Sequence, residues 1–230
     1  TCARRGNGNA MSSGLNKFLV LSRKEFISEW RNKSAISSIL LYTGTTVFLI
    51  FMLFDKITVS QWITLFWIVY LFASLNAVVR SFSQLNINEH LYYYHLIRPS
   101  FLIGVKMIYN SLLMLAITLL VFTLFSFFIS QPIKNLELWF LIVFLANLGL
   151  SFSFTFIASI AAQAGPNTTL MAILAFPLIL PQLLLITRLS KVAANGLQAS
   201  DALSLLLSLS AIDLMIFIVS YLLFPYLWKR

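Results

Sequence analysis

The stretch Met107–Ile129, MIYNSLLMLAITLLVFTLFSFFI, determines how the rest of the chain is interpreted. It contains no charged residue and exceeds the ~20 apolar residues that a helix needs to cross a bilayer. The whole chain of 230 residues shares this bias, with 60% hydrophobic, 15% aromatic and only 10% charged residues and a mean hydropathy of +0.89. A soluble fold cannot hide so much apolar surface, since even a ~300-residue domain buries only ~75% of its surface. The sequence therefore predicts a membrane protein and excludes a soluble enzyme.

Six apolar stretches of this kind predict six transmembrane helices, at Ile36–Phe54, Ser60–Val79, Phe101–Ile129, Leu138–Ala162, Thr168–Thr187 and Ala202–Trp228. Turn or charge signals separate them, including Asp55-Lys56, Gln131-Pro132 and Lys191–Asp201. The runs are continuous rather than alternating, which argues against a transmembrane barrel. The predicted fold class is an all-α membrane protein, whose six-helix transmembrane domain occupies residues 36–230.

The first 35 residues divide into two parts. Residues 1–10 lack the apolar core of a signal peptide and precede Met11, so we expect a non-native or disordered leader. Residues 11–35 predict an amphipathic helix in the membrane interface, with a solvated extension of the first span as the alternative. Its apolar face carries Leu15, Leu19, Phe26 and Trp30, and its basic face carries Lys17, Lys24 and Arg31.

The distribution of lysine and arginine predicts the orientation. If the N-terminus is cytoplasmic, ten of these residues beyond position 10 lie inside, and four lie outside: Lys56, Lys134, Arg188 and Lys191. We therefore expect both termini in the cytoplasm. The net charge of +9 reflects the same bias and suits contact with anionic lipid. We therefore expect no nucleic-acid partner.

The chain lacks the sequence motifs that are typical of nucleotide-binding, catalytic and metal sites. It has no G-x-x-x-x-G-K-[ST] loop, no H-E-x-x-H and no Cys-x-x-Cys, so we predict no catalytic residue and no metal site. If the protein uses ATP, a separate chain must bind it. His90 and His95 are five residues apart, which turns them about 140° from each other on a helix. Interfacial packing is the simpler interpretation of the two histidines, and a ligand role is the alternative.

Polar residues inside the predicted spans are the first candidates for function. Asp213 lies near the middle of the sixth span, where a carboxylate costs ~2.5–3.5 kcal/mol. Asn147 lies at a similar depth in the fourth span, so we predict a hydrogen bond between Asp213, in its neutral form, and Asn147. A transport role for Asp213 is the alternative. Asn110 and Gln182 complete the intramembrane polar set.

Two further patterns concern helix packing. Ser151, Thr155 and Ser159 follow one another at four-residue steps, which predicts close approach of a neighbouring helix. Pro177 and Pro181 each remove a helix hydrogen bond next to Gln182, so that the fifth span contains either a hinge or a tolerated bend.

The long segment between the second and third spans, from Arg80 to Pro99, is the candidate contact for a motor subunit. It is cytoplasmic by the predicted orientation, and Pro99 joins it to the third span, where we expect Lys106 near the inner headgroups. Exposed Tyr and Arg are favoured at protein interfaces, and an interfacial aromatic belt is the alternative. The predicted ATPase-docking residues are Glu89, Leu91, Tyr92, Tyr93, Tyr94 and Arg98.

Taken together, these features resemble the membrane subunits of type 2 ABC exporters, and most closely the CcmB family of haem exporter proteins in cytochrome c maturation. The segments that carry the resemblance are Leu91–Leu96 with Pro99, Lys106–Asn110, Gly165–Pro177 and Pro181–Leu183. One departure lies in the loop, where many family members have several acids and a Gly. Here the corresponding residues, Asn86–His90, contain only Glu89 as an acid and no Gly.

The resemblance implies a permease subunit in the bacterial inner membrane, without an ATPase site of its own. Its implied partners are a CcmA-like ATPase that binds ATP, a CcmC-like haem-handling subunit and a CcmE-like haem chaperone. ATP hydrolysis would then drive release of the haem-loaded chaperone or export of haem, with haem as the substrate of the complex and no cofactor bound directly. The alternatives are a type 2 permease for glycan, lipid or drug, and a membrane scaffold without transport activity.

Overall fold

The computed structural model describes residues 33–83, 99–163, 168–197 and 199–227, and within these ranges the chain forms α-helices and no strand. The predicted all-α fold class is thus confirmed. The helices are α2 (Lys33–Leu53), α3 (Val59–Ser83), α5 (Pro99–Ile129), α6 (Leu136–Gln163), α7 (Thr168–Asn195) and α8 (Ala199–Leu227).

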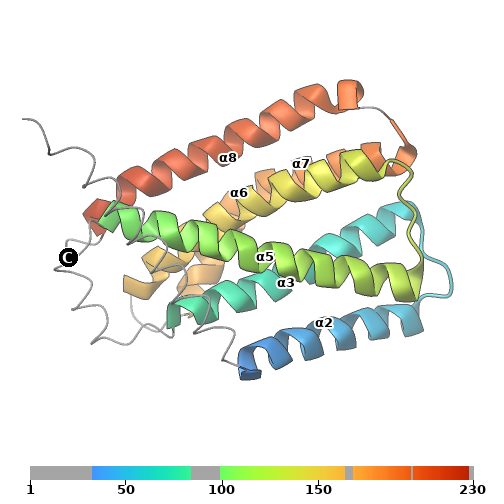
Figure 1. Cartoon of the computed structure of the whole chain (residues 1–230), viewed down its shortest axis with the longest axis horizontal. Helices are drawn as coiled ribbons and strands as arrows, with labels where there is room; N and C mark the ends of the chain where they lie inside the picture. The colour runs from blue at the N-terminus through green and yellow to red at the C-terminus, as the bar shows by residue number, and fades with distance from the viewer. Residues whose placement is uncertain (1–32, 84–98, 164–167, 198, 228–230) are drawn as a thin grey trace, which may run out of the picture.

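Successive helices run in opposite directions along one bundle, with α2 and α8 at opposite edges (Figure 1). The N-terminal end of α2 and the C-terminal end of α8 consequently lie at the same end of the bundle. We call this the inner end, after the predicted orientation, and the opposite end the outer end. Five helices, α3 and α5 to α8, are long and apolar enough to cross a membrane. The apolar stretch of α2, Ser37–Leu53, is shorter.

Helix α6 is the centre of the bundle. It packs against α3, α5, α7 and α8, and a larger share of it is buried than of any other of the five long apolar helices. At its outer end, Trp139 lies in an aromatic cluster, with ring centroids 5.3 Å from Phe66 and 5.7 Å from Trp62. Edge-to-face contacts of this kind stabilise a core beyond the area that they bury. The outer end of the bundle is therefore tightly packed.

The outer turns have well-defined capping chemistry. Thr58 and Gln61 form a capping box at the start of α3, in which the Thr58 N–H donates to Gln61 Oε1 at 2.9 Å. Asn135 caps α6 by accepting the Leu138 N–H at 3.1 Å, and its own backbone N–H donates to the Ala193 carbonyl. These contacts fix the start of α6 against the end of α7.

Helix α7 is longer than the sequence predicted. It was expected to end at Thr187, before a loop that included Lys191, but it continues to Asn195, and α8 already begins at Ala199. The prediction was wrong because Arg188 and Lys191 project from an exposed face, while the opposite face remains buried through Ala193. The helix ends instead at Gly196, with φ +81°, in a Schellman motif in which the Leu197 N–H donates to the Val192 carbonyl.

Candidate functional site

Helix α6 buries polar residues on two opposite faces. Asn147, Ser151 and Thr155 are fully or almost fully buried and follow one another at four-residue steps. Gly149 and Ser153 are also buried, and each lies two positions after a member of the first set. Two positions along a helix correspond to a rotation of about 200° around its axis, so these two residues lie on the opposite face. The first set faces α5 and α3, and the second set faces α7 and α8. We call these the α5 face and the α7–α8 face.

On the α5 face, Asn147 connects three helices. Its Nδ2 donates to the carbonyl of Ser111 at 3.0 Å and contacts Ser111 Oγ at 3.2 Å. Its Oδ1 accepts the hydroxyl of Tyr70, from α3, at 3.2 Å. All of these side chains are buried, so both ends of the Asn147 amide are satisfied within the bundle.

Two further contacts extend the α5 face toward the inner end. Ser151 Oγ donates to the Met107 carbonyl at 3.2 Å, and Asn110 Nδ2 donates to Thr155 Oγ1 at 2.9 Å. The predicted close packing along Ser151, Thr155 and Ser159 is confirmed, since all three are buried and the first two bond to α5. Asn110 Oδ1 is buried without a hydrogen-bond partner among the described residues.

On the α7–α8 face, Gln182 connects α6, α7 and α8. Its Oε1 accepts the hydroxyl of Ser153 at 2.9 Å, and its Nε2 donates to Asp213 Oδ1 at 3.0 Å. Ser153 Oγ also lies 3.0 Å from the carbonyl of Gly149 in its own helix. Gln182 is fully buried and Asp213 is 7% exposed. Within the described part of the chain, Asp213 Oδ2 has no hydrogen-bond partner.

Gly149 makes this arrangement feasible. The carboxyl group of Asp213 occupies the space into which a Cβ atom at position 149 would project. Any side chain at this position would therefore collide with Asp213, so only glycine permits α8 to approach α6 so closely.

The predicted pair Asp213–Asn147 is wrong. Asp213 bonds to Gln182, while Asn147 bonds to Tyr70 and Ser111 on the other side of α6. Asp213 does lie beside the expected turn of α6, since it contacts Gly149, two residues beyond Asn147. The predicted pair is wrong because depth along a helix does not determine which face a residue occupies.

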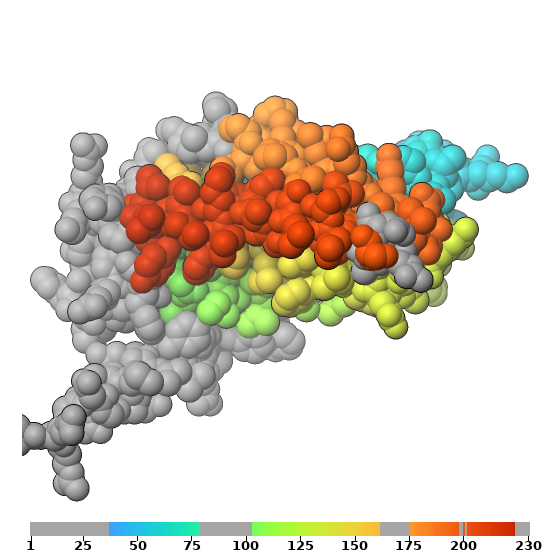
Figure 2. Space-filling view, turned by 90° about the horizontal axis from the view of Figure 1, so that it is seen from above, coloured from blue at the N-terminus to red at the C-terminus, as the bar shows by residue number. Residues whose placement is uncertain are grey.

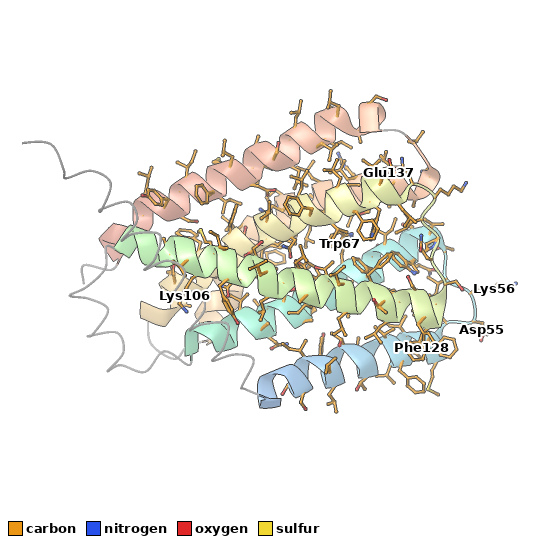
Figure 3. The ribbon with its side chains drawn as sticks, viewed as in Figure 1. Asp55, Lys56, Trp67, Lys106, Phe128 and Glu137 are labelled. Carbon is orange, nitrogen blue, oxygen red and sulfur yellow. The ribbon has the colours of Figure 1, made fainter. Side chains whose placement is uncertain are left out.

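Two prolines and one lysine that the sequence singled out lie within described helices. Pro177 and Pro181 lie in α7, which continues as a helix through both, and they are exposed. Lys106, expected near the inner headgroups, lies in the inner half of α5, and its side chain is only 4% exposed (Figure 3). Four predicted features lie outside the described residues: the docking residues from Glu89 to Arg98, both histidines, the interfacial helix before Lys33 and the leader.

Four contributors were missed from the sequence, namely Tyr70, Ser111, Gly149 and Ser153. Gly149 and Ser153 share a four-residue spacing, which was the one available signal of a second polar face on α6. Among the described residues, no group of three or more His, Cys, Asp or Glu is placed to hold a metal ion.

Residues 16–221, most of the chain, match a protein family described as "CcmB protein". No curated protein and no solved structure matches the chain.

Proposed function

The chain belongs to the CcmB family of multi-pass membrane subunits of the ABC transporter for haem handling in cytochrome c maturation, and from this premise we propose how it works. It receives force from a separate CcmA-like ATPase and transmits it through its helices, so that the complex releases a haem-loaded CcmE-like chaperone or exports haem. A CcmC-like subunit hands haem to the same complex. ATP is bound by the ATPase subunit, and this chain binds no cofactor directly.

One observation supports the transmission step, namely that α6 is hydrogen-bonded to helices on both of its faces. Its α5 face is bonded to the helix that directly follows the predicted docking segment. Its α7–α8 face is bonded to Gln182, and through Gln182 to Asp213. A displacement of α5 would therefore reach α8 through side chains that are already in contact.

The predicted contact with the ATPase is the segment Leu85–Arg98. Its residues lie outside the described part of the chain, but α5 begins at Pro99 and continues as one helix to Ile129. Proline at the first helical position is preorganised for a helix start. A helix of this length attached directly to the docking segment is a rigid lever. The tyrosines provide contact area, and Glu89 and Arg98 provide orienting charge.

Truncation of the tyrosines tests this contact. Tyr92→Ala combined with Tyr93→Ala should release the ATPase or uncouple its hydrolysis, while the helices remain inserted. Tyr221→Ala is the control for the loss of an exposed tyrosine, because Tyr221 is 49% exposed on α8 and lies outside the segment in the sequence. Co-purification of the ATPase and its activity are measured for each variant. Normal binding and coupling in the double variant would place the docking site elsewhere.

In this proposal, Pro177 and Pro181 form a hinge in α7. Gln182 directly follows Pro181 and carries the bonds to both α6 and α8. A proline in a helix removes one backbone hydrogen bond, so bending costs less there than elsewhere in α7. Movement at this point would displace Gln182 relative to Asp213.

The orientation belongs to the same proposal. The protein lies in the bacterial inner membrane with both termini in the cytoplasm. Single cysteines at Asn88 and Lys134, in a Cys2→Ser background, are to be labelled from outside the cell. Lys134 is exposed between α5 and α6 and should react, whereas Asn88 should not. The reverse result would invert the orientation.

Purification from native membranes, with an optical scan for haem, tests which subunits accompany the chain and whether haem does.

A further inference from the structure

The orientation of α7 is fixed at its outer end by buried contacts. Trp67 Nε1, from α3, donates to Ser190 Oγ at 2.9 Å, and Ser190, Ile186 and Ala193 are fully buried. These residues define the face of α7 that is packed inside the bundle. The opposite face is directed outward, and Figure 2 shows α7 at the surface beside α8.

The outward face of α7 changes its chemistry along its length. Its middle part is apolar, with Phe176 68%, Leu180 39% and Leu184 60% exposed. One turn further toward the outer end, the same face carries Arg188 and then Lys191, and both are exposed. Residues spaced by three or four positions lie next to one another on a helix, so the five side chains form one continuous stripe.

The change from apolar to cationic falls in the last two turns of α7, close to the level at which the apolar helix α6 begins. The Ala193 carbonyl accepts the backbone N–H of Asn135, the residue before the apolar helix α6 begins. At 1.5 Å per residue, Lys191 lies roughly 3 Å and Arg188 roughly 7.5 Å below that level. Long cationic side chains extend such distances to reach the headgroups. Both charges can therefore reach the phosphate layer of the adjacent leaflet.

Within the described residues, the two cations are not neutralised by acidic side chains. Asp55 and Glu137 are exposed at the same end of the bundle (Figure 3), yet no ion pair joins Arg188 or Lys191 to any side chain that the structure describes. A guanidinium matches phosphate with two parallel donors, and an ammonium adds a point charge. The stripe thus combines an anion site with an apolar track beneath it.

We propose that this stripe of α7 binds an anionic phospholipid, whose phosphate is held by Arg188 and Lys191 and whose acyl chain lies along Leu184, Leu180 and Phe176. The lipid occupies the leaflet at the outer end. This site is independent of how the ATPase contacts the chain, because it depends only on the helix faces described above.

The test uses the full-length chain in phosphatidylcholine nanodiscs supplemented with phosphatidylglycerol. Native mass spectrometry after extraction measures how much phosphatidylglycerol the protein retains. A cation near an anionic surface contributes about 1 kcal/mol, so Arg188→Gln and Lys191→Gln should each weaken retention by about fivefold. Lys56→Gln is the matched control, because Lys56 is exposed at the same end but lies outside α7 (Figure 3). It should leave retention unchanged.

Two further measurements separate the lipid from other anions and from misfolding. Inorganic phosphate should not displace the phosphatidylglycerol, because it lacks an acyl chain, and Leu184→Ala should weaken retention without removing charge. Thermal unfolding in phosphatidylcholine alone should be the same for all variants, since the substituted side chains are exposed. Three results would overturn the proposal. They are an equal loss of phosphatidylglycerol retention in Lys56→Gln and Arg188→Gln, no loss of retention in either α7 cation variant, and full displacement of the phosphatidylglycerol by inorganic phosphate.

Discussion

The two faces of α6 differ in how their buried polar groups are held. On the α5 face, Asn147 has partners for both its donor and its acceptor atoms, from two other helices. On the α7–α8 face, Asp213 accepts one described hydrogen bond, from Gln182, and the contact requires a glycine in α6. Among the described residues, each face keeps a buried oxygen without a partner: Asn110 Oδ1 on the α5 face and Asp213 Oδ2 on the α7–α8 face. The α5 face is therefore the fixed contact, because several side-chain bonds join α6 to α5 and α3 there. The α7–α8 face can rearrange at lower cost, because one described bond, from Gln182, reaches α8.

The largest expected effect concerns Gly149, because the difference between the faces depends on how closely α8 approaches α6. Gly149→Ala places a methyl group in the space of the Asp213 carboxyl and should destabilise the bundle by about 1–3 kcal/mol. Gly44→Ala and Gly104→Ala are matched controls, since a Cβ there meets no atom within 4 Å. They should be neutral or stabilising by up to ~1 kcal/mol, because alanine is the better helix former.

The free energy of unfolding in a titration with sodium dodecyl sulfate measures these differences. The double variant Gly149→Ala, Asp213→Ala should recover part of the loss, because it removes the group that collides. Equal behaviour of all three glycine variants would show that Asp213 does not hold α8 against α6.

The second prediction tests the fixed face. Asn147→Ala removes the bonds to Tyr70 and Ser111 and should cost about 1.5 kcal/mol, near the upper end for polar contacts between membrane helices. Asn76→Ala is the control, since Asn76 is exposed on α3 and its Nδ2 bonds only to Phe72 in the same helix. It should change the unfolding free energy by a few tenths of a kcal/mol. If the two variants lose the same stability, the α5 face is not held by its polar contacts.

A third prediction concerns Asp213 itself, which we expect to act as a neutral packing group. Asp213→Asn keeps the shape and an acceptor for Gln182, so it should be almost silent. Asp213→Leu leaves Gln182 Nε2 without its acceptor and should cost about 1 kcal/mol. Cytochrome maturation is measured in cells at equal protein levels. A complete loss of maturation in Asp213→Asn would favour a transport role for the carboxyl group instead.

The fold was largely predictable from the sequence because hydropathy alone decides which segments can lie in lipid. The described helices appear where the apolar stretches are, and α5 begins at Pro99, two residues before the predicted start at Phe101. The end of α7 was not predicted, because charges at Arg188 and Lys191 suggested a loop. A helix at a membrane boundary tolerates cations on its exposed face, and only the Schellman motif at Gly196 ends it.

The polar contacts were predicted less well, for a geometric reason. Counting residues gives depth in the membrane to within a turn, and Asp213 does lie beside the turn of α6 that contains Gly149. Pairing also depends on the rotation of each helix about its axis, which is determined by the packing of all neighbouring helices. The sequence of α6 contains polar residues on both faces, so it did not indicate which of them α8 would meet.

The smallest expected effect compares two serines of α6 on its opposite faces. Ser151→Ala removes a donor from the Met107 carbonyl, but that carbonyl keeps its helical hydrogen bond within α5, so the loss should be below ~0.5 kcal/mol. Ser153→Ala leaves Gln182 Oε1 without a donor, and no backbone bond replaces it, so the loss should be about 0.6 kcal/mol. Combining Ser153→Ala with Gln182→Leu should then be less than additive, because the second change removes the stranded oxygen. Replicate unfolding titrations of the single and double variants measure the coupling. A larger loss in Ser151→Ala than in Ser153→Ala, or additive losses in the double variant, would mean that the α7–α8 face does not depend on its hydrogen-bonded connection.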